Sequence, residues 1–106
     1  MIEIPIGKSI KVAGFDVALK DDKEATLKMH DECKLGRSHN YLRAIELDGG
    51  MPPQGFSATF IHELLHQIDD VFFDSALSEQ QVNCVAAGFH QVLEQYGIRF
   101  VRNEGT

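Results

Sequence analysis

The sequence predicts an α+β domain, because its first half alternates apolar and polar residues as strands do and its second half has the period of helices. The alternation is clearest in the first twenty residues and again near residue 45. The helical period extends from Pro53 to about Phe72 and again from Ser78 to about Tyr96. At 106 residues one hydrophobic core can close and a second would be too small. Residues 1–106 are therefore expected to form one domain.

The strand signals predict a small antiparallel or mixed sheet. Residues 2–6 (IEIPI) have a β pattern, and residues 8–20 predict a hairpin that turns at Ala13-Gly14. Residues 21–33 have an acidic start suited to a helix but no clean period, so either a short helix or an irregular connection fits them. Ser38 to Asn40 predict a turn, and residues 43–47 predict the strand that follows.

Two helices follow the predicted sheet. The first has an apolar arc that leaves the residues His62, Glu63 and His66 outside it. The second begins at Ser78 with the Ser-x-x-Gln pattern of a capping box and ends before Gly97. The arc of the first helix contains Phe60, Ile61, Leu64, Leu65, Ile68, Val71 and Phe72. The face of the second helix that is expected to pack in the core contains Val82, Val85, Ala86, Phe89, Val92, Leu93 and Tyr96.

Charge and composition exclude several classes of partner. The net charge is −6 and the ten Lys and Arg are scattered, so we expect no nucleic acid and no anionic membrane surface as a ligand. No apolar run approaches the ~20 residues of a membrane span, and the N-terminus lacks the pattern of a secretory signal. Cys33 and Cys84 have no partner motif and favour reduced thiols. A cytoplasmic protein is therefore expected.

Residues 62–66, HELLH, place two histidines four positions apart with Glu63 after the first. Positions i and i+4 lie one turn apart, about 40° around the helix axis, so both imidazoles can bind one ion at about 2.0–2.1 Å. Glu63 is rotated about 100° from His62, so we expect a general base rather than a ligand. Chance predicts roughly 0.02 such motifs in a chain of this composition. The motif therefore favours a metal site over a solvated polar face.

A catalytic zinc site normally has three protein ligands and an open position for water. Glu79, in the first turn of the last helix, is the leading candidate for the third ligand, because its stripe can face the histidine pair if the two helices pack together. Asn83, one turn further on, would then hydrogen-bond the outer nitrogen of His62. Asp69 is the main alternative, since it lies near the histidine face of its own helix. Glu79 can also be explained as a partner of the helix dipole.

Four segments together resemble a known family: LGR at 35–37, AIELD at 44–48 before a proline-containing loop, HELLHQID at 62–69, and LSEQQVNCVAA at 77–87. They resemble small zincin-like metallopeptidases of the gluzincin type, which include short phage and prophage proteins. In the related repressor-cleaving peptidases of the ImmA and IrrE kind, a Glu-x-x-Ala-Asn pattern supplies the third ligand. Here the run begins at Glu79 and has Val82 in place of the Ala. The resemblance also implies that the strand at 43–47 borders a cleft, where an extended peptide can pair with the sheet edge.

The sequence thus predicts a zinc-dependent metallopeptidase acting on a peptide or protein substrate. His62, His66 and Glu79 would hold Zn²⁺, and Glu63 would take a proton from a metal-activated water and deliver it to the leaving amine. Two alternatives stay open. One is a zincin-like domain that keeps its metal as a structural or regulatory binding module without hydrolysis. The other is a metal-free helical adaptor. The substrate, the oligomeric state and the residue that stabilises the transition state are not determined by the sequence.

The C-terminal third of the chain contains three further candidate features: His90, Tyr96 and the segment at 98–101. His90 shares the Glu79 stripe and Tyr96 ends the last helix, and a packing or surface role is favoured for both because a lone His or Tyr carries little signal. The segment at 98–101, IRFV, alternates like a strand and is a candidate to lie across or beside the cleft. In that case deleting residues 98–106 should raise peptidase activity.

Overall fold

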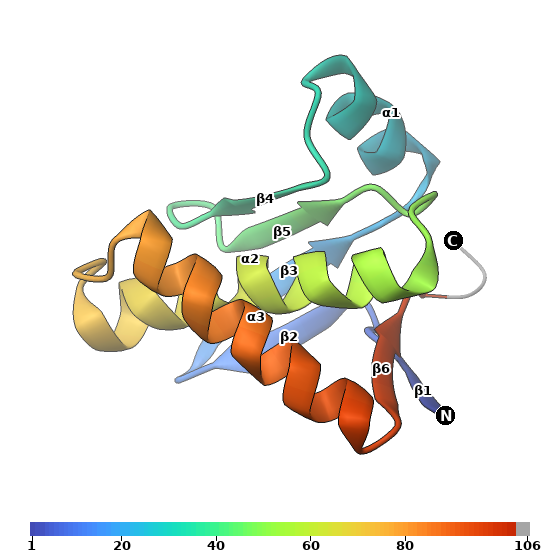
Figure 1. Ribbon diagram of the computed structural model, residues 1–106. Helices are drawn as coiled ribbons and strands as arrows, with labels where there is room; N and C mark the ends of the chain where they lie inside the picture. Colours follow the sequence, from blue (N-terminus) through green and yellow to red (C-terminus); the bar gives the residue numbers. More distant parts are fainter. Residues whose placement is uncertain (104–106) are drawn as a thin grey trace.

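The computed structural model describes residues 1–103 and has an α+β fold, which confirms the predicted class (Figure 1). Three helices accompany strands that form two sheets. In chain order the elements are β1 (Ile2–Pro5), β2 (Ser9–Val12), β3 (Phe15–Lys20), α1 (Lys23–Asp31), β4 (Gly36–His39), β5 (Ala44–Leu47), α2 (Pro53–Phe73), α3 (Glu79–Gln95) and β6 (Ile98–Val101).

The larger sheet is mixed and has the strand order β2-β3-β5-β4. β2 and β3 form the predicted antiparallel hairpin, β3 pairs with β5 in parallel, and β4 pairs with β5 antiparallel. β4 is therefore an edge strand. Helix α2 lies across this sheet and α3 packs against α2 from the outside (Figure 1). The core between α2 and the sheet contains Val12, Val17, Leu19, Ile45, Leu47, Phe56 and Phe60.

The N-terminal and C-terminal strands form a small parallel sheet of their own, β1 with β6. Phe100 of β6 packs edge-to-face on Phe60, with 5.2 Å between ring centroids, and its backbone N–H donates to the Ser57 hydroxyl. Residues 98–101 thus lie against the 57–60 side of α2 and complete the core, rather than crossing the cleft. Deleting residues 98–106 should therefore destabilise the fold. Residues 104–106 of that segment lie outside the described residues.

The sequence assigned Ser38–Asn40 to a turn, and this is wrong for its first two residues, because β4 extends to His39. The side chains of this polar strand have partners on both faces: Gln67 donates to the Ser38 hydroxyl, and His39 bonds to Glu46. Paired in this way, an edge strand needs no apolar side chains. The segment left open between helix and irregular chain forms α1, whose first turn is capped by Asp22.

The apolar face predicted for the last helix is only partly buried. Val82 and Ala86 are buried and Leu93 is partly buried, whereas the other four side chains of that face are at least half exposed. The exposed fractions are 54% for Val85, 56% for Phe89, 50% for Val92 and 77% for Tyr96. The prediction fails here because a short chain supplies α3 with a neighbour on its inner side only. Among residues 1–103 there is also no helix with the length and apolar content that crossing a bilayer requires.

A buried carboxylate fixes β4 to its neighbours. Glu46 of β5 is 6% exposed and accepts hydrogen bonds from His39 at 2.6 Å, Arg37 at 3.0 Å and Lys28 at 3.1 Å. Burial alone raises the pKa of Glu46, but these three hydrogen bonds and the charge of Lys28 outweigh it and lower the pKa to about 2. The ionised form of Glu46 therefore stabilises the folded chain.

We expect Glu46→Gln to lower the free energy of unfolding at pH 7 by roughly 3 kcal/mol, the size that a pKa shift from 4.5 to about 2 corresponds to. Because the folded pKa is depressed, the contribution is complete above about pH 4.5 and is lost as the pH falls toward 2. Urea denaturation of parent and variant should show the difference narrowing over that range. Glu24→Gln, at an exposed position of α1, is the control. A Glu46→Gln difference that did not depend on pH would contradict this account.

Candidate metal centre

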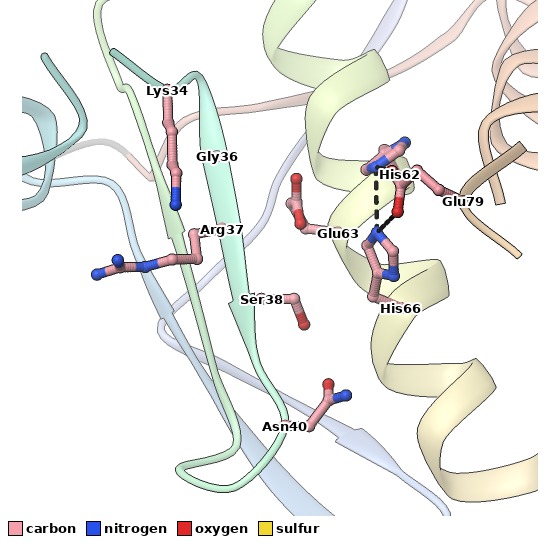
Figure 2. A pocket seen from close by; sticks show the side chains of 9 residues that line it. All are labelled: Lys34, Gly36, Arg37, Ser38, Asn40, His62, Glu63, His66 and Glu79. Atoms are coloured by element: carbon pink, nitrogen blue, oxygen red, sulfur yellow. Dashed lines mark hydrogen bonds and ion pairs between the residues drawn. The ribbon is translucent and has the colours of Figure 1, made fainter. Parts of the chain in front are cut away.

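Two histidines of α2 and a glutamate of α3 meet at one point. The Nε2 atoms of His62 and His66 are 3.2 Å apart. The two carboxylate oxygens of Glu79 lie 3.2 Å from the Nε2 of His62 and 3.4 Å from that of His66. Figure 2 shows the three side chains facing one another at the side of α2 that looks toward β4. The structure thus brings together the three residues that the sequence selected as ligands.

The spacing of these atoms suits a tetrahedral metal ion. Bonds of about 2.0–2.1 Å at tetrahedral angles place neighbouring ligand atoms roughly 3.3–3.4 Å apart. The observed separations are 3.2 Å between the two Nε2 atoms, 3.2 Å from His62 to one Glu79 oxygen and 3.4 Å from His66 to the other. Two imidazoles and a carboxylate also form a donor set that Zn²⁺ accepts. The residues therefore fit a zinc ion, although the same spacing admits other first-row divalent ions.

Local structure explains how Glu79 reaches the histidines. The capping box of α3 is complete, since Ser78 and Gln81 bond to each other's backbone N–H groups, and it fixes Glu79 as the first helical residue. The loop before it turns sharply through Asp74 and Ser75, both with positive φ. One side chain of α2 anchors that loop: the Asp69 carboxylate accepts from the backbone N–H of Leu77 at 3.1 Å.

Asp69, the rival candidate for the third ligand, is thereby directed to the α2–α3 loop and is 4% exposed. The structure records no contact between its carboxylate and either histidine in the described part of the chain. Asn83 is exposed and, within residues 1–103, makes no hydrogen bond to His62, contrary to the expectation for it. His90 lies 3.9 Å from Glu94, and Tyr96 is exposed at the far end of α3. Neither of the last two borders the cleft described below.

A second carboxylate, Glu63, belongs to the same cluster. Its oxygen and the ring nitrogens of His62 and His66 all lie within 4.8 Å of one another, close enough for these three residues to hold a metal ion as well. Glu63 is only 9% exposed. Burial, and then the negative charge of Glu79, raise the pKa of Glu63 to about 7, and Lys34 opposes them in part. A carboxylate with a pKa near neutrality is suited to accept and return a proton.

The surroundings of His62 favour the protonation state that metal binding requires. Burial, followed by the nearby charge of His66, lowers the pKa of His62, and Glu79 opposes this in part. A lowered pKa favours the neutral imidazole, which is the form that binds a metal ion.

An open cleft of about 290 Å³ lies over the cluster. Its far wall is β4 and the segment around it, whereas β5, the strand expected to border the cleft, lies inside the sheet. The sequence missed β4 because three of its four residues are polar or charged. The cleft is lined by Lys34, Gly36, Arg37, Ser38, Asn40, His62, Glu63, His66 and Glu79 (Figure 2).

Two residues outside the motif set the distance between α2 and β4. Gln67, one turn after Glu63, is completely buried; its amide donates to the Ser38 hydroxyl at 2.7 Å and to the His39 carbonyl at 3.1 Å. Gly36 permits the close approach, since a Cβ atom there would lie 2.7 Å from a methyl of Thr59 and 3.1 Å from the Cγ of Glu63. In the sequence, a glycine in the LGR segment and a polar residue following HELLH are the only signals of this contact.

Comparison of the chain with protein-family models, with curated proteins and with solved structures finds no match to any of the three.

Gly36→Ala should lower the free energy of unfolding by about 1–3 kcal/mol, because the added methyl forces α2 away from β4. Gly55→Ala is the matched control: it is in α2 and its added methyl meets nothing within 4 Å, so stability should be unchanged or higher by up to about 1 kcal/mol. Urea denaturation of both variants measures the difference. Equal stability of the two variants would show that the Gly36 contact has no energetic weight.

Proposed function

We propose that the protein is a zinc-dependent metallopeptidase in which His62, His66 and Glu79 bind Zn²⁺ and Glu63 is the general base. The observation that carries the proposal is the convergence of two imidazole nitrogens and the Glu79 carboxylate, 3.2–3.4 Å from one another, beside a buried carboxylate and within an open cleft. A metal site that has three protein ligands and remains accessible has room for water or substrate at a fourth position. The resemblance to small gluzincin-type zincins favours the same assignment.

The surroundings of Glu63 suit proton transfer during peptide hydrolysis. Zn²⁺ held by the three ligands would supply Lewis-acid polarisation of a peptide carbonyl and would lower the pKa of water to about 7. Glu63, with its own pKa raised to about 7, accepts the proton of the attacking water. It then delivers that proton to the leaving amine.

The edge strand β4 gives the substrate a place to bind. It pairs with β5 on one side only, and it forms the wall of the cleft opposite Glu63. An extended peptide segment can pair with such an edge through its main chain. We therefore propose a peptide or an unfolded protein segment as the substrate. The two free cysteines, both exposed, support the cytoplasm as the compartment.

One observation also favours the alternative, in which the metal ion has a purely structural role. Only Val82 and Ala86 of α3 are buried, so an ion shared by Glu79 and the two histidines would help to fasten α3 to α2. A measurement of peptide hydrolysis distinguishes the two functions, because a purely structural metal site needs no general base.

Glu63→Gln should bind zinc as the parent does and should hydrolyse peptides at least about 100-fold more slowly, since only the proton-accepting group is removed. Zinc content by elemental analysis and cleavage of a quenched fluorescent peptide library measure the two properties. Glu24→Gln, an exposed carboxylate of α1, is the control and should match the parent in both. If Glu63→Gln retained turnover, the base assignment would be wrong. If neither the parent nor the control hydrolysed any peptide, the structural alternative would replace the proposal.

Glu79→Ala should weaken zinc binding at least about tenfold, because the ion loses one of three protein ligands. Asp69→Asn should keep the parent's affinity even though it weakens the loop anchor at Leu77. Competition with a chromophoric chelator measures both affinities. The reverse result, strong binding by Glu79→Ala and weak binding by Asp69→Asn, would assign the third ligand to Asp69.

A further inference from the structure

The outer side of α3 presents a stripe of large apolar side chains that are at least half exposed. We call it the α3 stripe, and it consists of Val85, Phe89, Val92 and Tyr96. Its members follow one another at intervals of four, three and four residues, the spacing that forms a continuous seam along one side of a helix. Monomeric proteins seldom expose a connected apolar surface of this kind without a use for it.

A groove extends the stripe toward α2. It has a volume of about 180 Å³, and Val85 and Phe89 belong to both the stripe and the groove. The lining of the groove is entirely apolar: Ile61, Leu64, Leu65, Ile68, Val85, Ala86 and Phe89. The stripe and the groove together therefore form one apolar surface across α2 and α3.

The exposed surface of α3 beyond its first residue carries no charge. Glu94 is the only other charged residue of this helix, and it is largely buried and paired with Arg99 at 2.7 and 3.1 Å. The exposed positions of α3 after Glu79 are Gln80, Gln81, Asn83, Cys84, Val85, Ala87, Gly88, Phe89, Gln91, Val92 and Gln95. A quarter of the chain is charged, so this depletion is local, and depletion of charge is typical of the centre of a protein interface.

We propose that the α3 stripe binds the α3 stripe of a second copy of this chain, with the two helices antiparallel. The spacing of four, three and four is the same in both directions, so an inverted copy matches it position by position. The two-fold axis passes between His90 and Gln91. A symmetric dimer of this type uses one self-complementary patch twice.

The side chains on the stripe support this pairing by size. About the two-fold axis, Phe89 lies opposite Val92, and Val85 lies opposite Tyr96, so each aromatic ring meets a smaller side chain. Tyr96 of the second copy also lies beside the groove at Val85 and is placed to fill it. Facing helices pack well when large and small residues alternate across the interface.

The net charge of the chain restricts where two copies can meet. Two chains that each carry −6 repel one another over most of their surfaces. The uncharged stripe is a surface that both can present without bringing like charges together. Glu79 is at the N-terminal end of α3, so the antiparallel arrangement places the two metal centres at opposite ends of the interface. The proposal therefore does not depend on peptidase activity.

Sedimentation equilibrium from about 10 µM to about 1 mM tests the proposal, a range that covers weak and moderate dimers. The parent should show a dimer, and Phe89→Lys should raise the dissociation constant at least about tenfold because it buries a charge. Leu27→Lys, the same change at an exposed apolar residue of α1, should dimerise as the parent does. Circular dichroism of each variant checks the fold. A monomeric parent, or equal effects of the two lysine variants, would overturn the proposal.

A swap of sizes tests the antiparallel register without adding charge. Phe89→Val leaves small side chains opposite each other and Val92→Phe places two rings opposite each other, so each single variant should weaken the dimer by about tenfold. The double variant, Phe89→Val with Val92→Phe, restores one ring opposite one valine and should recover the parent's dissociation constant. Additive weakening in the double variant would overturn the antiparallel pairing.

Discussion

The contact between α2 and the edge strand β4 is the constraint on which the centre depends. Gln67 is completely buried and joins the two elements through Ser38 and the His39 carbonyl. One turn earlier on the same side of α2, Glu63 lies against Gly36, where no side chain intervenes. Glu46 holds the other face of β4 through His39 and Arg37. Strand β4 is thus held on both of its faces. These contacts set the distance between β4, which is the wall of the cleft, and the buried carboxylate of Glu63.

The two carboxylates of the centre have different environments, and this separates their roles. Glu79 is exposed and has one oxygen 3.2 Å from the Nε2 of His62 and the other 3.4 Å from the Nε2 of His66, so its position suits a ligand. Glu63 is buried and its pKa is raised to about 7, partly by the charge of Glu79 itself. A carboxyl group whose surroundings raise its pKa toward neutrality is a usual candidate for acid and base functions. The two glutamates, Glu63 and Glu79, can therefore have different functions because their surroundings differ.

The features that the sequence predicted are those set by neighbours in the chain. The bounds of α2 and α3 follow from apolar periodicity, from the capping box at Ser78 and from Gly97, whose positive φ ends the last helix. The histidine pair follows from the geometry of one helical turn. Glu79 was reached by adding one assumption about how two helices pack. Apart from that packing assumption, these features depend only on residues that are close together in the chain.

The features that the sequence missed depend on distant partners. β4 has the composition of a turn and becomes a strand because Glu46 and Gln67, 9 and 29 residues from their partners Arg37 and Ser38, satisfy its side chains. The parallel pairing of β1 with β6 joins the two ends of the chain and has no local signal. For α3 the periodicity located the apolar face correctly, but it could not state how much of that face this short chain is able to cover.

The limited burial of α3 connects the candidate metal centre with the α3 stripe. Only Val82 and Ala86 of this helix are fully buried, so much of its apolar face is left uncovered by the described part of the chain. An ion bound through Glu79 and a second copy bound through the stripe would each favour the docked helix over an undocked one. Ligands that stabilise the same state do so in proportion to their occupancy, and each then raises the affinity for the other by an equal factor. A helix whose apolar face is only partly buried is for this reason suited to respond both to the ion and to the second copy.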